Sequence, residues 1–245
     1  MRIGALTGSL LLCLPPHIAW RLAGRPSPWP RRFLALAARS VGARVRVDGQ
    51  QVAGPHIILA NHVSWIDILA LGGATGTAFV SHDGVARWPL IGWLAAQNNT
   101  LFVARARRGA IAGQLDSLRA ALNGRQPVAL FPEGTTGDGT GILPFKPSLL
   151  AALLPPPRPC LVQPVHIDYG ASATDIAWHG DESAGANAMR LLRREGALHI
   201  TLRFLEPFDP LLCADRKALA ARTRGQIADS MATHQPPSAS PFRPV

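Results

Sequence analysis

The sequence predicts an α/β fold, namely a single domain with a mixed, mainly parallel central sheet flanked by helices. Two observations predict it. Short apolar runs typical of buried strands alternate along the chain with stretches of helical periodicity, which indicates a sheet covered by helices. The chain has 245 residues, enough for one well-buried domain and too few for two full domains with a linker. We expect this domain to occupy residues 44–234.

The first 43 residues differ in composition from the rest of the chain. The run from Ile3 to Leu14 is apolar, but Pro15 and Pro16 are expected to interrupt it, whereas a membrane-spanning helix needs about 20 apolar residues. Residues 17–32 then hold two tryptophans, three prolines and four arginines, a mixture suited to a lipid headgroup region or to a Pro-rich connector. We expect residues 1–43 to form a helical, membrane-associated segment that inserts without spanning. Packing of the apolar run in the protein core is the alternative.

The elements of the domain follow from local patterns. A helix is expected over Phe33 to Gly42, and the alternation of arginine and valine over residues 44–47 predicts a short strand. Apolar residues recur at helical spacing from Ile111 to Leu122. Asp215 to Thr233 reads as a last amphipathic helix, and the Pro-rich residues 235–245 are expected to be disordered. The other expected strands are Ile57–Ala60, Ala78–Ser81, Thr100–Val103, Val128–Phe131, Cys160–His166 and His199–Phe204.

The charge balance indicates an anionic partner. The chain has 25 Lys and Arg against 15 Asp and Glu, a formal net charge of +10, so it suits either anionic lipid or nucleic acid. The basic residues are spread along the chain and a single tyrosine leaves few platforms for stacking bases, so nucleic acid is not expected as a partner. Three widely spaced cysteines favour a reducing compartment and offer no metal-ligand cluster.

The most informative motif runs from Asn61 to Asp67, directly after the apolar strand Ile57–Ala60. Ligands bind at strand ends in open α/β sheets. His62 could remove the proton of a hydroxyl group, and Asp67 could orient its ring if a helix starts after His62. Ser64 lies outside any G-x-S-x-G motif, so a serine hydrolase is not indicated and the serine is expected to cap the helix. The alternative is an ordinary capped helix start without catalysis.

A second motif, Phe131-Pro132-Glu133-Gly134-Thr135-Thr136, also follows an apolar strand and leads into glycines at 137, 139 and 141. A carboxylate at a strand end can accept hydrogen bonds from a polyol, and glycines allow backbone amides to approach a substrate closely. The motif therefore predicts a polar binding site that contains Glu133. The alternative is a glycine-rich turn in which Glu133 is solvated.

Four sequence blocks between residues 56 and 170 together resemble the motifs of the lysophospholipid acyltransferase family, typified by 1-acylglycerol-3-phosphate acyltransferase. Their order and intervals match the family, and a chance match of all four is remote. The resemblance implies an enzyme that transfers a fatty acyl group to the hydroxyl of a lysolipid. The blocks are Asn61-His62-x4-Asp67, Leu101–Arg105, Phe131–Thr135 and Val162–Val165.

The resemblance also implies roles for single residues. His62 matches the family's catalytic base, and Asp67 matches the carboxylate that orients it. The activated hydroxyl then attacks a thioester directly, acyl-ACP or acyl-CoA, with no cofactor and no metal. The enzyme is expected at the cytoplasmic face of the inner membrane, either as a monotopic protein or with a single N-terminal anchor. The residues matched to acceptor binding are Arg105, Glu133, Gly134 and Thr135.

One position departs from the family pattern. Members that make phosphatidate commonly have Arg after Glu-Gly-Thr, whereas this chain has Thr136. A charge-assisted hydrogen bond to a phosphate is therefore missing unless Arg105, Arg107, Arg108 or Lys146 supplies it. The segments 135–146 and 178–181 instead resemble the lyso-ornithine lipid acyltransferase branch, whose acceptor is a 3-hydroxyacyl amide of ornithine without phosphate.

The expected function is acylation of 1-acyl-sn-glycerol-3-phosphate to phosphatidic acid. A lyso-ornithine lipid is the alternative acceptor, and a non-catalytic lipid-binding protein is the alternative from another class. The segment from Trp88 to Trp93 could line a groove for an acyl chain, but filling of the core is the favoured interpretation.

Overall fold

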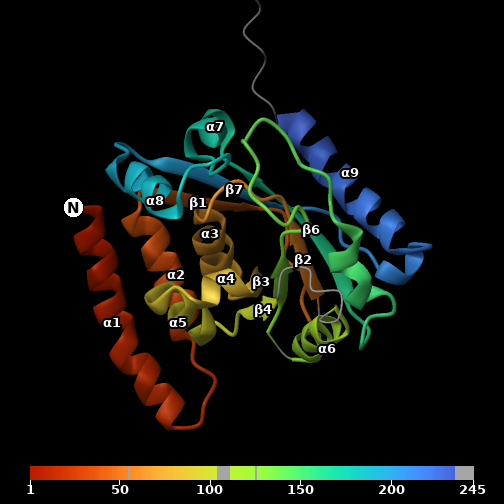
Figure 1. The fold of residues 1–245 in the computed structure, drawn as a ribbon, viewed down its shortest axis with the longest axis horizontal. Coiled ribbons are helices and arrows are strands. Elements are labelled where there is room, and N and C mark those ends of the chain that lie inside the picture. The colour runs from red at the N-terminus through yellow and green to blue at the C-terminus, as the bar shows by residue number, and fades with distance from the viewer. Residues whose placement is uncertain (55, 104–110, 125, 235–245) are drawn as a thin grey trace, which may run out of the picture.

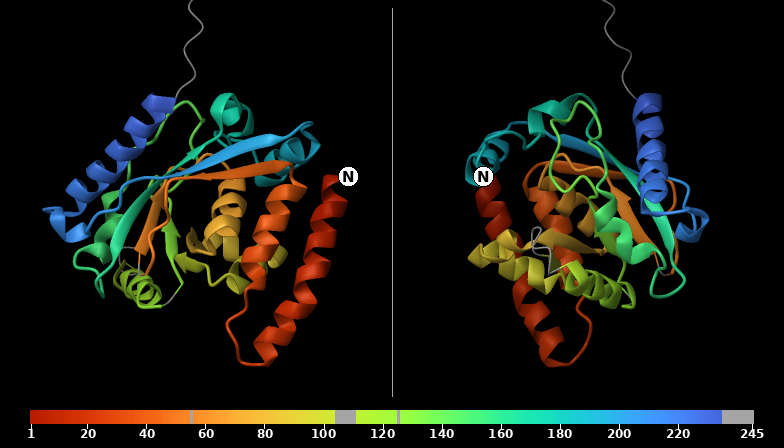
Figure 2. Two further views of the ribbon diagram at one scale, coloured as in Figure 1. Left: turned by 180° about the vertical axis from the view of Figure 1, so that it is seen from behind. Right: turned by 45° about the vertical axis from the view of Figure 1, so that its right-hand side comes forward.

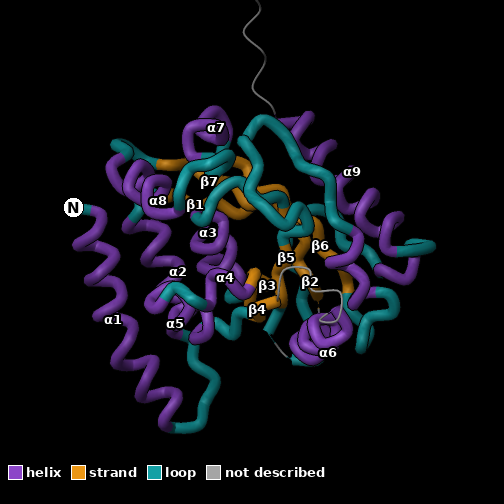
Figure 3. The backbone as a smooth tube through the Cα atoms, in the orientation of Figure 1, coloured by secondary structure: helices purple, strands orange, loops and turns teal. Residues whose placement is uncertain are grey.

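The computed structural model of the chain describes residues 1–54, 56–103, 111–124 and 126–234, with the side chains of 111–115 left out. Within these residues a seven-stranded sheet runs in the order β1-β7-β6-β2-β5-β3-β4 (Figures 1 and 3). The strands are β1 (Ala43–Asp48), β2 (His56–Ala60), β3 (Ala78–His82), β4 (Leu101–Val103), β5 (Val128–Leu130), β6 (Leu161–Asp168) and β7 (Leu198–Phe204).

The direction of the strands confirms the predicted mixed, mainly parallel sheet. β6 and β7 pair antiparallel, and every other neighbouring pair in the order is parallel. The carboxyl ends of β6, β2 and β5 therefore lie side by side at one edge of the sheet. These three ends lead into residues 169, 61 and 131, so the first and third sequence blocks start next to each other.

Helices cover both faces of the sheet (Figures 1 and 2). Central strand β2 is buried along its whole length, and its side chains alternate between the two faces: Ile58 enters one hydrophobic cluster and Ile57 the other. The Ile58 cluster includes residues of α2, α3 and α8, and the Ile57 cluster includes residues of α6 and α9. This layering is that of an α/β domain.

The predicted helices over 111–122 and 215–233 are confirmed, and the helix predicted from Phe33 begins four residues earlier, at Trp29. The predicted disordered tail, 235–245, lies outside the described residues. The helices are α1 (Arg2–Leu22), α2 (Trp29–Ser40), α3 (Ile66–Thr75), α4 (Asp83–Ala86), α5 (Pro89–Gln97), α6 (Ile111–Leu122), α7 (Ala173–Ile176), α8 (Ala184–Arg193) and α9 (Arg216–His234), with 3-10 helices at Pro147–Leu153, Gly170–Ser172 and Pro210–Leu212.

Helix α1 is continuous across Pro15 and Pro16, so the predicted interruption is wrong. Proline lacks the N–H group that donates to the carbonyl oxygen four residues earlier in a helix. The carbonyl oxygens of Leu11 and Leu12 therefore lack this hydrogen bond. Both leucines lie on the exposed side of the helix, whereas Cys13 is buried against the domain. Packing against α2 keeps the backbone helical on both sides of the prolines.

Polar contacts near both ends hold α1 along the surface of the domain (Figure 2). At its start, Nη2 of Arg2 donates to the carbonyl oxygen of Gly196 over 2.7 Å. Near its end, the ring nitrogens of His17 pair with Oγ of Ser27 at 2.8 Å and with Oε1 of Gln97 at 3.0 Å. By length and composition, the 21-residue helix is apolar enough to cross a membrane, and little of it is buried in the domain.

Candidate active site

His62 and Asp67 form a hydrogen-bonded pair, as their spacing predicts. His62 follows β2 directly, and its Nδ1 lies 2.7 Å from Oδ2 of Asp67, which is in the first turn of α3. The Asp67 side chain is 0% exposed and the His62 side chain is 19% exposed. Since an ionised carboxylate only accepts, Nδ1 carries the proton, which leaves Nε2 as the ring nitrogen that can accept one.

The Asp67 carboxylate also organises the turn that precedes α3. Its Oδ2 accepts hydrogen bonds from the backbone N–H groups of Val63 at 2.8 Å and Ser64 at 3.0 Å. Its Oδ1 accepts a short hydrogen bond from the hydroxyl of Tyr169. One carboxylate therefore both holds the turn before α3 and orients the imidazole. The expectation that Ser64 caps the helix is wrong, because the N-cap residue of α3 is Trp65 and it makes no side-chain cap hydrogen bond.

A stacking contact fixes the plane of the imidazole. The His62 ring lies on the ring of Phe131, with centroids 4.0 Å apart and planes inclined by 13°. Phe131 follows β5, which pairs parallel with β2, so both rings come from neighbouring strand ends. The contact with Phe131 and the hydrogen bond to Asp67 together leave the ring little freedom.

Glu133 is buried between the two motif loops, so the alternative in which it is solvated is wrong. It is 2% exposed. Its Oε1 accepts from the backbone N–H of His62 at 2.7 Å, and its Oε2 accepts from the backbone N–H of Leu143 at 3.0 Å. Burial raises the pKa of Glu133 to about 7, although both backbone hydrogen bonds act in the opposite direction. The carboxylate thus holds the His62 loop at its backbone.

Gly134 and Thr135 lie in an exposed turn after Glu133. Gly134 has a φ of +68°, and a Cβ atom added there would lie 2.8 Å from Nζ of Lys146. The left-handed backbone conformation favours glycine here, and the Lys146 ammonium group lies directly beside it. The structure thus brings together five of the predicted site residues, whereas Arg105 lies outside the described residues.

Thr136, the position that departs from the family pattern, closes one side of the site. Its hydroxyl donates a short hydrogen bond to the carbonyl oxygen of Trp178, and the backbone N–H of Trp178 donates to Val63 at 3.0 Å. The next residue, Gly137, donates its N–H to the carbonyl oxygen of His62 at 2.8 Å. The second motif, the His62 loop and the segment around Trp178 are therefore joined.

An apolar cavity of about 740 Å³ adjoins this site. Its volume is within the roughly 300–1,000 Å³ typical of small-molecule pockets. Trp65 and Trp178, which flank the His62 loop, are among its lining residues. The rest of its wall is mainly apolar and comes mostly from five helices, with Leu10 of α1, Phe33 of α2, Ile68 of α3, Ile91 of α5 and Leu192 of α8 as examples.

The segment from Trp88 to Trp93 lines this cavity and does not fill the core, so the favoured interpretation of this segment is wrong. Trp88 is 41% exposed and Trp93 is 42% exposed, and both line the cavity. The large side chains of the short helix α5 are exposed or line the cavity, and Gly92 is its one buried residue; Figure 1 shows the helix beside α2 and α4.

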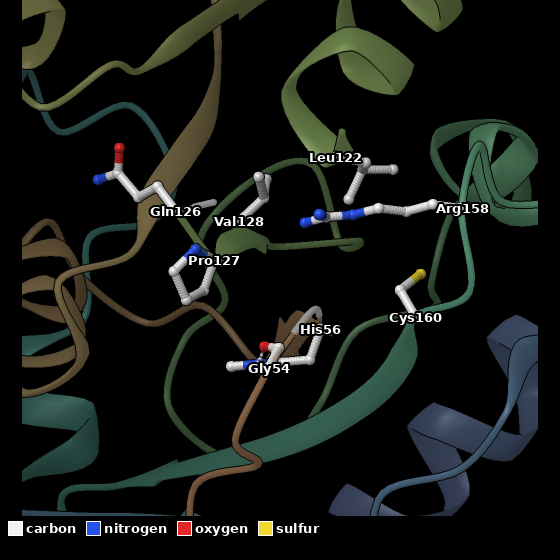
Figure 4. Close-up of a pocket in the computed structure, with 8 residues that line it drawn as sticks. All are labelled: Gly54, His56, Leu122, Gln126, Pro127, Val128, Arg158 and Cys160. Carbon is white, nitrogen blue, oxygen red and sulfur yellow. Dashed lines mark hydrogen bonds between the residues drawn. The ribbon is translucent and has the colours of Figure 1, made fainter. Parts of the chain in front are cut away.

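A second cleft lies at the opposite edge of the sheet (Figure 4). His56 and Val128 at the amino ends of β2 and β5 contribute to it, together with Cys160 just before β6 and Arg158. It contains no enclosed space for a water molecule. None of its lining residues belongs to the four sequence blocks, which agrees with ligand binding at the carboxyl ends of the strands.

Two contributors to the site escape prediction from the sequence. Tyr169 comes 102 residues after Asp67, and no pattern in the sequence indicates that the two residues are in contact. The available signal is the position of Tyr169 directly after β6, the strand that the structure places next to β2. Trp178 belongs to a segment noted for its resemblance to one branch of the family, and its contact with Thr136 is visible only in the fold. Among the described residues, no group of three or more His, Cys, Asp or Glu side chains is placed to hold a metal ion.

Comparison with known proteins identifies the family. The model of the acyltransferase family matches residues 44–168, about half of the chain. A lyso-ornithine lipid O-acyltransferase of Brucella abortus is 34% identical over 81% of this chain and 81% of its own length. A 1-acyl-sn-glycerol-3-phosphate acyltransferase of Neisseria gonorrhoeae is 32% identical over 64% of this chain and 56% of its own length.

The fold has a relative of known structure. The crystal structure of a 1-acyl-sn-glycerophosphate acyltransferase from Thermotoga maritima superimposes with a TM-score of 0.63 at 20% identity, covering 87% of this chain and 80% of that chain. That likeness confirms the architecture. The family match and the sequence relatives go further, and they show that this chain is an enzyme of the lysophospholipid acyltransferase family.

Proposed function

We propose that the enzyme transfers a fatty acyl group from acyl-ACP or acyl-CoA to the hydroxyl of a lyso-ornithine lipid, with His62 as the general base. The observation that carries the chemistry is the His62–Asp67 pair beside an apolar cavity. A histidine held by a buried carboxylate can take a proton from a hydroxyl group, and the cavity can hold an acyl chain.

The proposed reaction needs one base and one leaving group. The acceptor oxygen attacks the thioester carbonyl carbon while its proton moves to Nε2 of His62, and the Asp67 carboxylate stabilises the resulting imidazolium. The tetrahedral intermediate then collapses, the C–S bond breaks, and the departing sulfur takes the proton from Nε2. The products are the ester and a free thiol, and the imidazole is neutral again.

Two observations favour a lyso-ornithine lipid over 1-acyl-sn-glycerol-3-phosphate as the acceptor. The lyso-ornithine lipid O-acyltransferase of Brucella abortus matches over 81% of this chain, whereas the 1-acyl-sn-glycerol-3-phosphate acyltransferase of Neisseria gonorrhoeae matches over 64%. The hydroxyl of Thr136 is engaged by the carbonyl oxygen of Trp178, at the position where phosphatidate-making members commonly place an arginine. Lys146, beside Gly134, is then the group to meet the carboxylate of the ornithine.

The proposed location is the cytoplasmic face of the inner membrane, with α1 lying in the interface and not spanning it. The outward side of α1 is apolar: Leu11 is 66% exposed and Leu12 is 63% exposed. The contacts of Arg2 and His17 keep the helix on the domain. Arg21 and Arg25, both exposed at its end, are placed to meet anionic headgroups.

The test is product detection by mass spectrometry with the purified enzyme. Acyl-ACP and acyl-CoA are each offered with lyso-ornithine lipid, 1-acyl-sn-glycerol-3-phosphate and other lysophospholipids, using wild type, His62→Ala and His199→Ala. His199 is an exposed histidine on β7 and takes no part in the His62–Asp67 pair. We expect the ester of lyso-ornithine lipid from wild type and His199→Ala, and none from His62→Ala.

Each other outcome contradicts a separate part of the proposal. Product from the glycerol phosphate alone would overturn the acceptor. Equal product from His62→Ala would overturn the role of His62. Loss of acyl thioester without any added lysolipid would indicate a hydrolase, and lipid binding without turnover would indicate a binding protein.

A further inference from the structure

Tyr169, the chain's single tyrosine, reaches the catalytic pair from a distant part of the sequence. It follows β6, the neighbour of β2, and is 4% exposed. Its hydroxyl donates a short hydrogen bond to Oδ1 of Asp67. Three sheet neighbours thus contribute to one site, because β2 leads to His62, β5 leads to Glu133 and β6 leads to Tyr169.

The two oxygens of Asp67 have different partners. Oδ2 accepts from Nδ1 of His62 and from the backbone N–H groups of Val63 and Ser64, whereas Tyr169 is the donor to Oδ1 within the described part of the chain. A carboxylate rotates easily about its Cβ–Cγ bond, since this torsion has broad minima. Donors on both oxygens therefore fix its plane, and with it the direction of the bond to His62.

The Tyr169 hydroxyl is suited to this task at all physiological pH values. Its burial and the neighbouring Asp67 charge raise the pKa of Tyr169 well above 10. It therefore stays protonated and donates. Because Asp67 is fully buried, solvent cannot easily replace a lost donor, and the oxygen would remain unsatisfied.

We propose that Tyr169 is a positioning residue for acyl transfer, which holds the Asp67 carboxylate in the orientation that aligns the imidazole of His62. The inference rests on the proposed role of His62 as the base. Tyr169 acts through Asp67, so its loss lowers the rate of the chemical step and leaves substrate binding intact.

The test removes only the hydroxyl, with Tyr169→Phe. The matched control is Thr223→Val, which also deletes one fully buried hydroxyl, but in α9 on the other face of the sheet, where it bonds the carbonyl oxygen of Leu219. For both variants kcat, KM and the unfolding midpoint are measured. We expect Tyr169→Phe to lower kcat about tenfold with KM changed less than twofold. Thr223→Val should change neither.

A spectroscopic measurement separates positioning from a general loss of structure. A proton shared between His62 Nδ1 and a buried carboxylate is expected to give a low-field NMR resonance, assigned by its absence in His62→Ala. Tyr169→Phe should shift or broaden this resonance, whereas Thr223→Val should leave it unchanged. An unchanged resonance and unchanged kcat in Tyr169→Phe would overturn the inference, as would equal losses in both variants. Full activity of His62→Ala would instead overturn the proposed function.

Discussion

The imidazole of His62 lies face to face with the phenyl ring of Phe131, 4.0 Å away between centroids. The hydrogen bond to Asp67 sets the rotation of the imidazole within its plane, and the phenyl ring sets the plane itself. In the proposed reaction His62 is the general base and must meet the hydroxyl group from a defined direction, so we expect both contacts to matter for the rate.

Phe131→Leu is expected to lower kcat about tenfold while KM changes little. The imidazole of His62 gains freedom, whereas the apolar cavity is unchanged. Loss of part of a buried side chain should also lower the free energy of unfolding by about 1 kcal/mol. Phe204→Leu is the control, since Phe204 is equally buried and has no contact with the imidazole. Steady-state kinetics and urea unfolding check both values. Equal kcat in the two variants would contradict the role of the stack.

Glu133 should make the stability of the protein depend on pH. Its ordinary pKa of 4.5 applies in the unfolded chain, and burial raises the pKa to about 7 in the folded protein. Between these values the folded protein keeps a proton that the unfolded chain has lost, so stability falls as pH rises from about 4.5 to 7.

Glu133→Gln removes this titration. The difference in free energy of unfolding, wild type minus variant, is therefore expected to decrease across that pH window and to level off above it. Chemical unfolding at a series of pH values measures the difference, in which the other titrating groups largely cancel. A difference that does not vary with pH would mean that Glu133 titrates at its ordinary value.

The outward side of α1 should carry much of the membrane affinity. Replacing Leu11 and Leu12 together by serine removes exposed apolar surface, which is expected to weaken binding to anionic vesicles about tenfold. The control replaces Val45 and Val47 by serine, because these exposed valines lie on the edge strand β1. Vesicle sedimentation distinguishes the pairs. Equal weakening by both would place the membrane contact elsewhere.

The size of the apolar cavity should limit the acyl chain that it holds. Ala188 of α8 lines the cavity, so Ala188→Trp is expected to reduce kcat/KM for the longest acyl chains about tenfold and to spare short ones. Met189, the next residue, is exposed and lies outside the lining, and Met189→Trp serves as the control. Assays with acyl chains of graded length, in donor and acceptor, check the result. A uniform loss at all lengths would indicate misfolding and not a filled cavity.

The sequence predicts those parts of this site that lie close together in the chain. His62 and Asp67 are five residues apart, so the start of a helix is sufficient to bring them together, and alternating apolar runs predict the strands that carry them. The pair of Tyr169 with Asp67 could not be predicted, because it depends on β6 lying next to β2. Sheet order is set by long-range packing that no local pattern records.

Burial was harder to predict than position. The sequence predicts the position of Glu133 near the end of a strand. It does not predict that the side chain is buried, because a charged residue in a glycine-rich segment is ordinarily solvated. Its burial follows from two backbone N–H groups that come from separate loops. In the opposite sense, Trp88 and Trp93 look like core residues by composition, but both are partly exposed and line a cavity.

Helix α1 supplies Leu6, Leu10 and Leu14 to the wall of the cavity. The opposite side of the helix is exposed and carries the apolar residues Leu11 and Leu12. Removal of an N-terminal helix is a common step toward a water-soluble form of a membrane enzyme. Here it would remove part of the wall of the apolar cavity and expose the apolar residues beneath. Production of a soluble enzyme for crystallisation or screening should therefore keep residues 1–25 and replace the outward leucines of α1 by polar residues.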